Sequence, residues 1–326
     1  MQNPIRLLES LRQRKLSRRE FLKLFLYGLA GLILGSELLR PEAAKAAGFN
    51  GRKKRGIKGD HDIVLAEGDD PYTMTRRAIE AMGGMSRFVK KDDTVLVKPN
   101  IAWDRAPEYA ANTNPAVVAA LVELCYEAGA KRVNVFDISC NSAQRTYVTS
   151  GIQKAAQEKG AKVYFADDWN VINAHFNYES PMEGWPIIRD AIDCDVFINV
   201  PVLKHHGLTS LTLSMKNLMG VCSSSRGQIH SGIGTKLVDL TDFIQPDLTV
   251  IDAYRVLLKN GPTGGNLNDV VKMGKLIAAT DPTLADAYAA KMAGKDPLSI
   301  CYIAEAAKRG FGSTNIDGAD ILKISV

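Results

Sequence analysis

The stretch Val196–Cys222 decides the fold of this chain, and its sequence is VFINVPVLKHHGLTSLTLSMKNLMGVC. Residues 196–200 form an apolar run rich in β-branched side chains, and Pro201 ends the run because proline cannot donate a backbone hydrogen bond. This pattern predicts a buried strand. The polar side chains that follow are Lys204, His205, His206 and, one helical segment later, Lys216 and Asn217. Ligands of open α/β sheets bind beyond the carboxyl ends of the strands, so these side chains are candidates for a site, and a solvated turn is the alternative.

Strands and helices alternate on both sides of this stretch. The patterns predict helices over 72–82, 114–128, 149–159, 235–243, 282–292 and 297–309, and strands over 61–66, 94–97, 132–136, 162–165, 195–200, 248–251, 275–279 and 321–325. Segment 167–186 is expected to be an irregular excursion or a small hairpin. Such alternation is typical of right-handed βαβ units. We therefore expect an α/β fold with a mainly parallel sheet, helices on both faces and a ligand pocket at the carboxyl ends of the strands.

Residues 1–46 have the organisation of a twin-arginine signal peptide. Arg18 and Arg19 lie within SRREFLK, and an uncharged run follows over residues 24–36. This run is too short for a bilayer, which a helix spans with about 20 apolar residues. Ala44-Lys45-Ala46 is a candidate cleavage site. We expect periplasmic or equivalent export through the twin-arginine translocase, with no stable membrane span after cleavage. An uncleaved amphipathic anchor is the alternative.

Charge separates this leader from the rest of the chain. Residues 1–46 hold nine Lys/Arg and four Asp/Glu, which leaves 32 of each sign for residues 47–326. The net charge of +5 therefore belongs to the leader, and the body has no basic footprint for nucleic acid. A composition of 46% hydrophobic and 24% charged residues is that of a soluble globular protein. We predict a signal peptide over 1–46, a basic linker over 47–60 that acts as a flexible tether, and an α/β domain over 61–326.

The cysteines do not indicate a metal cluster by their spacing. The chain has five, and none forms a C-x-x-C pair, so neither a ferredoxin-type cluster nor a zinc ribbon is encoded. Because five is odd, at least one thiol stays free even in an oxidising compartment.

Four predicted strands end in polar side chains. The residues at these ends are Lys98, Asn100, Asp137, Lys204, His206 and Asp252. Parallel strands end at the same edge of a sheet, so these side chains can converge on one pocket. Lys98, Lys204 and Lys216 together would suit a carboxylate or a phosphate, although each alone can be a surface lysine. Packed closely, they would lower one another's pKa values and leave one lysine neutral as a base or nucleophile.

Other polar groups indicate a metal or an anion. His206, His230, Asp137 and Asp252 could supply nitrogen and oxygen ligands to a divalent metal such as Zn²⁺, although no HExxH pair occurs. Two glycine-rich loops, 225–234 and 261–265, could offer backbone N–H groups to an anion. The chain has no P-loop, no GxGxxG after a strand and no GxSxG, so nucleotide binding and serine hydrolysis have no motif behind them.

A series of motifs is similar to the domain-of-unknown-function family 362 (DUF362). In order, they are VKPN (97–100), NVPVLKHH (199–206), MKNLMG (215–220), His230, PDLTVID (246–252), NGPTxG (260–265), Asp281-Pro282 and Asp286. The resemblance covers about residues 62–326, and the family has no settled reaction. Its K-x-H pattern implies that His206, not His205, faces the site. Many relatives look like iron–sulfur proteins because they carry an appended ferredoxin-like cysteine module, which this chain lacks.

Three functions remain open. The first is an exported enzyme that acts on a small anionic molecule, with or without a divalent metal. Its assigned residues are Lys204, His206 and Asp252 for catalysis, Lys98, Asn100, Lys216, Asn217, Gly261 and Gly265 for substrate binding, and His206, His230 and Asp252 for a metal. The second is a non-catalytic periplasmic protein that binds an anionic solute or a metal. The third is a redox protein that holds an iron–sulfur cluster through Cys140, Cys222 and a bridging partner.

Overall fold

The computed structural model describes residues 49–166, 170–223 and 226–326. The signal peptide predicted for residues 1–46 lies outside them, so twin-arginine export stays a prediction. Within the described residues, no helix combines the length and the apolar character that are needed to cross a membrane.

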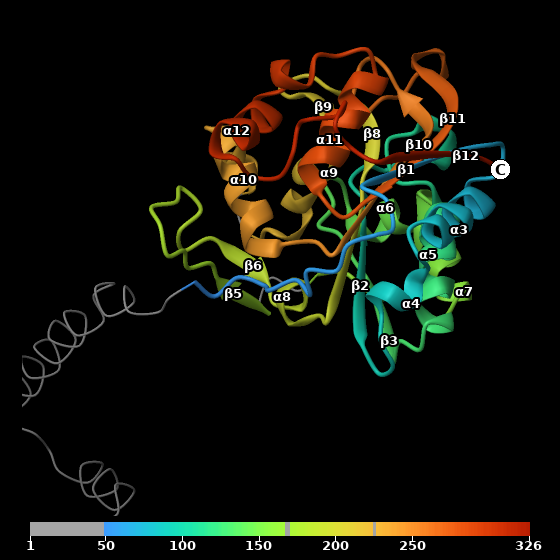
Figure 1. Ribbon diagram of the computed structural model, residues 1–326, viewed down its shortest axis with the longest axis horizontal. Helices are drawn as coiled ribbons and strands as arrows, with labels where there is room; N and C mark the ends of the chain where they lie inside the picture. The colour runs from blue at the N-terminus through green and yellow to red at the C-terminus, as the bar shows by residue number, and fades with distance from the viewer. Residues whose placement is uncertain (1–48, 167–169, 224–225) are drawn as a thin grey trace, which may run out of the picture. The chain divides into compact units, whose positions relative to one another are not determined.

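A sheet of ten strands runs through the middle of the described residues (Figure 1). Eight strands lie in the order β12-β1-β11-β10-β7-β2-β3-β4, while β8 pairs with β10 and β9 pairs with β8. Their bounds are β1 Ile63–Glu67, β2 Thr94–Pro99, β3 Arg132–Val135, β4 Lys162–Val163, β7 Val196–Val200, β8 Val202–His206, β9 Ser210–Thr212, β10 Leu248–Leu257, β11 Val270–Ala279 and β12 Ile321–Ser325.

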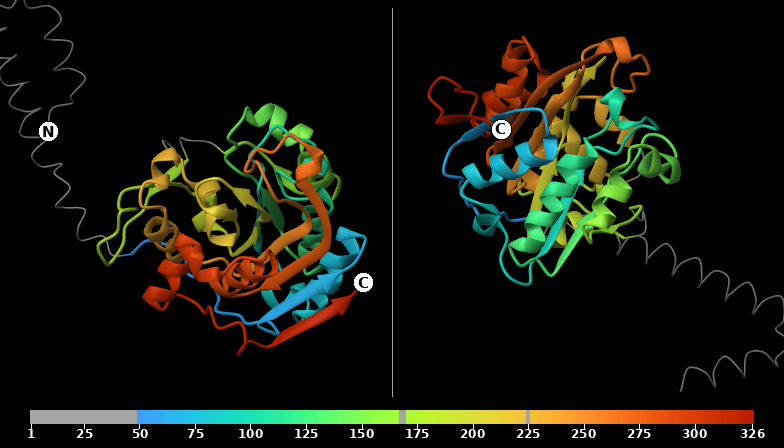
Figure 2. Two further views of the ribbon diagram at one scale, coloured as in Figure 1. Left: turned by 90° about the horizontal axis from the view of Figure 1, so that it is seen from above. Right: turned by 90° about the vertical axis from the view of Figure 1, so that its right-hand side faces the viewer.

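Most neighbouring strands are parallel. β10, β7, β2, β3 and β4 pair in parallel succession, and β12 is parallel to β1 at the other edge, where the two lie side by side in Figure 2. β11 is antiparallel to both of its neighbours, and β9 is antiparallel to β8. The mainly parallel α/β sheet expected from the sequence is therefore confirmed, with two antiparallel exceptions.

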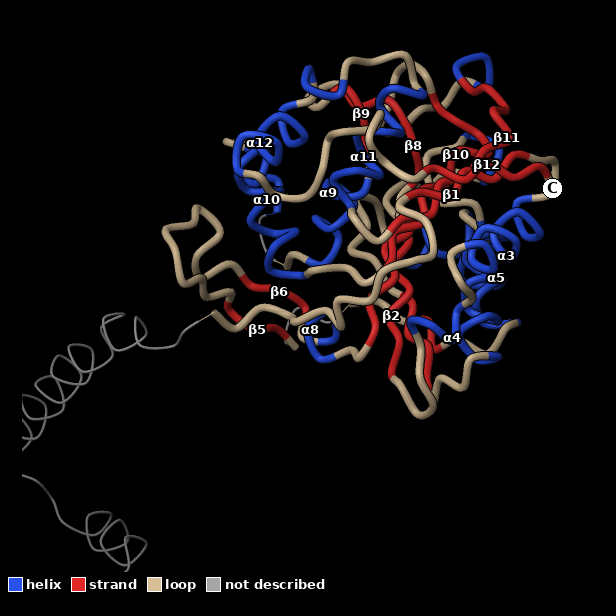
Figure 3. The backbone as a smooth tube through the Cα atoms, in the orientation of Figure 1, coloured by secondary structure: helices blue, strands red, loops and turns tan. Residues whose placement is uncertain are grey.

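Helices cover both faces of the sheet, as Figure 3 shows from the strands running between them. Their bounds are α3 Pro71–Ala81, α4 Met85–Phe88, α5 Pro115–Glu127, α6 Ala143–Thr149, α7 Ile152–Glu158, α8 Asp190–Asp193, α9 Ser214–Asn217, α10 Ile233–Ile244, α11 Pro282–Met292 and α12 Cys301–Arg309. Short 3₁₀ turns cover Pro107–Tyr109, Leu218–Val221, Arg226–His230, Leu267–Asp269 and Pro297–Ser299.

The two faces bury separate apolar cores because side chains alternate along each strand. On β2, Val95 and Val97 pack in one core with helices α3 and α5, while Leu96 packs in the other core with α10, α11 and α12. Each fully buried Val, Leu or Ile side chain contributes about 1.5–3 kcal/mol. Such burial can offset the cost of the polar groups that the sheet also buries at its edge.

Three helices begin where the sequence places a capping residue. The side chains of Asp70, Asn114 and Asp281 accept hydrogen bonds from backbone N–H groups in the first turns of α3, α5 and α11, and a proline follows each of them. This combination satisfies N–H groups that a helix start leaves without partners, and the fixed φ of proline suits the first turn.

Some predicted elements differ from the structure in ways that have local causes. The helix expected over 149–159 begins later, as α7 at Ile152, because Gly151 adopts a φ of +73°, and a separate helix that was not predicted, α6, precedes it. The strands expected over 248–251 and 275–279 extend into a long antiparallel pair, β10 and β11. Segment 167–186 contributes β5 Val171–Asn173, which pairs with β6 Pro186–Ile188, so the small-hairpin alternative is correct for its described part.

The basic segment before β1 is not a flexible tether over its described residues. Arg52 is buried, forms an ion pair with Asp247 and donates to the carbonyls of Cys194, Gln245 and Asp195. Arg55 forms two hydrogen bonds with the carboxylate of Asp93. The tether interpretation was wrong because positive charge alone does not show whether an arginine finds a buried carboxylate.

Candidate functional site

The central strand β7 ends at Val200, before Pro201 as predicted, and a second strand, β8, begins directly after the proline. β7 runs parallel to β2, and after Pro201 the chain continues as β8 alongside the second half of β10. Side chains of β8 alternate, so Lys204 and His206 share one face, while His205 lies on the other and accepts a hydrogen bond from the N–H of Gly261 at 3.1 Å. The structure thus places Lys204 and His206 in one cavity, as the spacing predicted.

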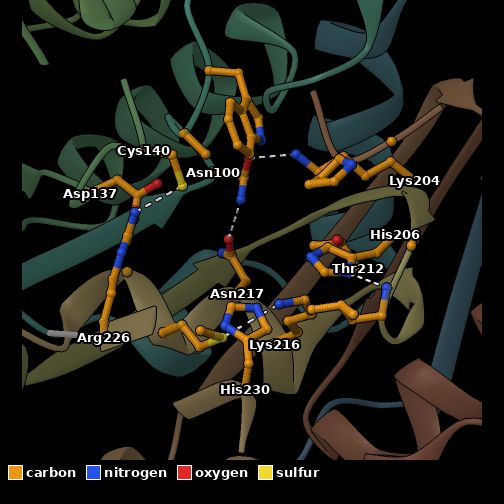
Figure 4. A pocket seen from close by; sticks show the side chains of 18 of the residues that line it. Asn100, Asp137, Cys140, Lys204, His206, Thr212, Lys216, Asn217, Arg226 and His230 are labelled. Atoms are coloured by element: carbon orange, nitrogen blue, oxygen red, sulfur yellow. Dashed lines mark hydrogen bonds between the residues drawn. The ribbon is translucent and has the colours of Figure 1, made fainter. Parts of the chain in front are cut away.

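This cavity has a volume of about 410 Å³ and lies beyond the carboxyl ends of β2, β3 and β8 (Figure 4). Its polar and charged lining comes from segments far apart in the sequence: Asn100, Asp137, Cys140, Lys204, His206, Thr212, Lys216, Asn217, Arg226 and His230. Trp103, Leu208, Met219 and Pro262 are among its apolar lining residues, and the backbone of Gly261 also borders it. We call this cavity the strand-end pocket.

Lys98 lies beneath the strand-end pocket and does not line it. Its ammonium is fully buried, forms an ion pair with Asp137 at 2.7 Å and donates to the carbonyl of Pro99 at 2.9 Å. Burial lowers the pKa of Lys98, and the carboxylate of Asp137 opposes that shift. Lys98 was predicted to bind substrate, but it does not line the pocket. Its charge is instead compensated by Asp137, which does line the pocket.

Gly220 is needed for this buried pair to fit. A Cβ atom at position 220 would lie 1.7 Å from Oδ1 of Asp137 and 2.6 Å from Nζ of Lys98. Asp137 also accepts a hydrogen bond from the backbone N–H of Ile101 at 2.6 Å. The carboxylate is thus neutralised and fixed in place before any ligand arrives.

Lys204 is also buried, but its surroundings differ. Its Nζ donates to the backbone carbonyl of Ala111 at 2.5 Å and to Oδ1 of Asn100 at 3.1 Å. No carboxylate pairs with it among the described residues. Burial, together with the charges of Lys216 and Lys98, lowers the pKa of Lys204 to about 7, although Cys140 and Asp137 raise it.

Lys216 reaches the pocket from the short helix α9. Its Nζ contacts the sulfur of Met219 at 3.5 Å, and burial lowers its pKa to about 8. The buried carboxylate of Asp286 holds the start of α9 by accepting from the backbone N–H groups of Ser214 at 2.6 Å and Met215 at 3.0 Å. Asp286, on α11, therefore positions Lys216 without touching the pocket.

Arg226 supplies the third cation of the pocket. Its guanidinium donates to the carbonyl of Ile138 and, at 3.0 Å, to the sulfur of Cys140. Neither partner is a carboxylate. Arg226 belongs to the glycine-rich loop that the sequence singled out only for its backbone N–H groups, so its side chain is a residue that sequence reasoning missed.

His206 and His230 lie with their rings stacked, 5.9 Å apart between centroids and 15° from parallel. Burial and the neighbouring charge of Lys216 lower the pKa of His206 to about 3, and burial lowers that of His230. Nδ1 of His206 accepts the N–H of Leu208 at 3.1 Å. Both imidazoles are therefore neutral at physiological pH, so they can accept or donate a hydrogen bond without adding charge.

The amides of Asn100 and Asn217 join these groups. Asn100 donates to Oδ1 of Asn217 at 3.1 Å, and Asn217 donates to Oδ1 of Asn199 at 2.8 Å. This chain of amides fixes the orientation of Asn100, whose own Oδ1 faces Lys204. Both predicted asparagines are thus brought to the pocket, and Asn199 supports them from β7.

Two predicted site residues lie elsewhere. Asp252 does not line the pocket: its carboxylate accepts from the backbone N–H groups of Asn114 at 2.7 Å and Tyr254 at 3.0 Å, and burial raises its pKa to about 6. It joins the start of α5 to β10. Gly265 borders Arg105 and is not among the residues that line the pocket, whereas Gly261 is.

The described residues do not fit the predicted three-ligand metal set. His206 and His230 are neighbours, but Asp252 is turned to backbone N–H groups outside the pocket. Among these residues no three or more His, Cys, Asp or Glu side chains are arranged to hold a metal ion. All five cysteines are free thiols, and burial raises the pKa of Cys222 to about 12, which disfavours the thiolate that a cluster needs.

Thr212 is a second pocket residue that sequence reasoning missed. It is 4% exposed, and its hydroxyl has no hydrogen-bond partner among the described residues. It lies directly opposite Lys204 in the antiparallel pair of β8 and β9. The alternation of Ser210, Thr212 and Ser214 with leucines was the signal that could have revealed a second polar-faced strand.

Comparisons with known proteins support a family assignment. The family described as "Domain of unknown function (DUF362)" matches residues 95–291. Thylakoid-associated protein sll1697 from a Synechocystis species is 29% identical over 249 residues, which cover 73% of this chain and 75% of the relative. The lactate racemase apoprotein from Thermoanaerobacterium thermosaccharolyticum is 11% identical with a TM-score of 0.46, covering 76% of this chain and 62% of that one. A Thermotoga maritima protein is 11% identical with a TM-score of 0.38, covering 60% and 54%.

Proposed function

The chain belongs to the DUF362 family, and from this premise we propose that it is an exported enzyme that acts on a small anionic molecule in the strand-end pocket. Lys216 and Arg226 hold the anion. Lys204 transfers protons, His206 forms a hydrogen bond to the substrate, and Asn100 and Asn217 orient the amine of Lys204.

The observation that carries this proposal is an imbalance of charge in the pocket. The cations Lys216 and Arg226 line it together with the amine of Lys204, and the described residues give none of the three a carboxylate partner. Among the described residues that line the pocket, Asp137 alone carries a carboxylate, and the buried Lys98 already neutralises it. Burying cations without counter-charges is costly, so an anion that enters would be bound by the charges that the fold leaves uncompensated.

The same arrangement supplies acid–base chemistry. A group with a pKa near the working pH is the most effective at exchanging protons, and the pKa of Lys204 is about 7. His206, with a pKa of about 3, stays neutral and serves as a hydrogen-bonding group beside it. A cavity of about 410 Å³ matches a small molecule, not a polymer.

The proposal includes export through the twin-arginine translocase. It rests on the SRREFLK pattern and the uncharged run of residues 24–36, and a relative bears the name thylakoid-associated. The variant with Arg18→Lys and Arg19→Lys should accumulate as an uncleaved precursor in the cytoplasm, as cell fractionation would show. Normal recovery of the cleaved variant outside the cytoplasm would contradict this route.

The binding step is tested with the purified mature protein and a panel of small anions: phosphate, oxalate and pyruvate, each measured by isothermal titration. Replacing Lys216 or Arg226 with Met removes a charge-assisted contact of about 1.5–3 kcal/mol, so affinity should fall about 10–100-fold. Lys154→Met, at a lysine whose side chain is 83% exposed on α7, is the matched control and should change nothing.

Equal affinity in the pocket variants and in the control would contradict the proposed function. Tight binding of an anion that the protein never alters, in turnover assays over the same panel, would instead favour the non-catalytic binding protein.

A further inference from the structure

We propose that Lys204 is an imine-forming amine, and that the anion taken by the strand-end pocket carries a carbonyl group, as a small 2-oxo acid does. This inference rests on the proposed function, because it assigns the substrate class of the same pocket. It separates Lys204, which would bond covalently to the substrate, from Lys216 and Arg226, which would hold its charge.

The hydrogen bonds of Lys204 match a neutral amine. An ammonium group has three N–H donors, whereas a neutral amine has two and a lone pair. Nζ of Lys204 has two oxygen acceptors among the described residues, the carbonyl of Ala111 at 2.5 Å and Oδ1 of Asn100 at 3.1 Å. When the amine is neutral, both of its N–H groups are directed to these acceptors and its lone pair is left for the cavity that Lys204 lines. Figure 4 shows the hydrogen bond to Asn100.

Asn100 cannot turn its amide to supply a donor instead. Its Nδ2 donates to Asn217 at 3.1 Å, and Asn217 in turn donates to Asn199 at 2.8 Å. The amide chain therefore keeps an oxygen, not an N–H group, against Nζ of Lys204. A lysine held in this way by two acceptors is oriented as well as desolvated.

Thr212 provides an independent indication of a ligand at the same position. Its hydroxyl is buried and has no partner among the described residues, and leaving such a group unsatisfied costs about 1–3 kcal/mol. Directly opposite residues in an antiparallel pair have side chains on the same face, so Thr212 and Lys204 line the same pocket from neighbouring strands. A carbonyl oxygen that meets the amine can accept the hydrogen bond of this hydroxyl.

The surrounding charges favour a nucleophilic lysine. Burial and the neighbouring cations Lys216 and Lys98 lower the pKa of Lys204 to about 7, while Cys140 and Asp137 act in the opposite direction. Desolvation beside another cation is an established way to activate a lysine for attack on a carbonyl.

The step balances with groups at hand. The lone pair of Nζ attacks the carbonyl carbon and forms a C–N bond, while the π electrons of the C=O bond move to oxygen, which receives a proton from the nitrogen. A second proton, from the ammonium of Lys216, lets the hydroxyl leave as water, and the nitrogen lone pair closes the C=N bond of a protonated imine. The N–H proton of this imine then returns to the neutral amine of Lys216. No oxidant or reductant takes part, and water is the only by-product.

The test uses the mature wild-type protein and three carbonyl probes, pyruvate, glyoxylate and 2-oxoglutarate, at neutral pH with sodium cyanoborohydride, which reduces an imine to a stable secondary amine. Intact mass spectrometry counts adducts, and peptide mapping locates them. Lactate, which lacks the carbonyl group, is the probe control. Oxalate, added in excess, competes for the pocket. Variants Lys204→Arg and Lys216→Met, checked for folding by circular dichroism, complete the set.

The expected result is one adduct at Lys204, at least tenfold above any other lysine, suppressed by oxalate and absent with lactate and in Lys204→Arg. Lys216→Met should keep some adduct at Lys204. If the carbonyl probes bind by titration but label only exposed lysines or none, the imine is overturned and the proposed anion site stands. If phosphate, oxalate and every carbonyl probe fail to bind, the proposed function fails as well.

Discussion

β2 and β8 each bury a lysine at the same edge of the sheet, and the two lysines have different partners and different access to the pocket. Lys98 meets a carboxylate at 2.7 Å and is sealed beneath the pocket. Lys204 meets only neutral oxygens and borders the cavity. Burial opposes the charged form of both, but only Lys98 has a counter-charge in place. A buried lysine is thus structural or chemical according to its partner, not its depth.

The largest expected effect comes from breaking the pair at β2. Asp137→Asn leaves the ammonium of Lys98 buried without a counter-charge, and removal of one partner of such a pair costs about 3–5 kcal/mol. Urea unfolding should show a loss of this size. The double variant Lys98→Met with Asp137→Leu removes both charges and should recover most of it. A loss of unfolding free energy below about 1 kcal/mol in Asp137→Asn would contradict a structural role for Lys98.

The fold and the placement of Lys204 in the pocket could be predicted from the sequence, whereas the partner of Lys98 could not. Apolar runs, N-caps followed by proline and alternating elements gave the α/β sheet, and period-two alternation placed Lys204 and His206 on one face. The misassigned residues share a cause. The partner of Lys98 lies 39 positions away, and Asp252 is satisfied by backbone N–H groups of two elements. A polar residue at a strand end does not reveal which partner it finds.

Local sequence patterns also could not predict which distant strands pair with one another. Pro201 marks the end of β7. A new strand, β8, begins directly after it because β10 is long enough to pair first with β7 and then with β8. That second pairing turns Lys204 and His206 toward the cavity and brings Thr212 opposite Lys204 through β9. Arg226 was not predicted because it lies in a glycine-rich loop, where the side chains follow neither helical nor strand periodicity.

A smaller effect concerns Lys204 and is measured as the pH dependence of the free energy of unfolding. In the unfolded chain Lys204 has its ordinary pKa near 10.5, and in the folded protein its pKa is about 7. Between these values the unfolded chain binds more protons, so stability rises with pH. Lys204→Met should remove up to about 1.4 kcal/mol per pH unit from this rise, measured by urea unfolding at about pH 7.5 and 9.5.

Lys216, whose pKa is lowered to about 8, contributes a slope of the same sign, so some rise should persist in Lys204→Met. A matched change at Lys154, which is exposed, should leave the slope intact. A slope unchanged by Lys204→Met would show that Lys204 binds its proton equally in both states.

The smallest effect compares the two faces of β8. His205→Ala loses one hydrogen bond, from the N–H of Gly261, and should cost about 0.5–1.5 kcal/mol of stability without changing oxalate affinity. His206→Gln keeps a polar side chain of similar reach but should weaken oxalate binding or turnover with little change in stability. Thermal unfolding and titration on both variants check this, and the reverse pattern would mean that the faces have been assigned wrongly.

The central claim, that Lys204 is a buried amine without a counter-charge, is tested most directly by NMR on protein labelled with ¹³C at the lysine Cε. The Lys204 signal is identified by its loss in Lys204→Arg and followed as pH is raised. Lys204 is expected to show an inflection near pH 7, well below the value of 10.5 for an ordinary lysine. A Lys204 signal that titrates together with the exposed lysines would contradict the account.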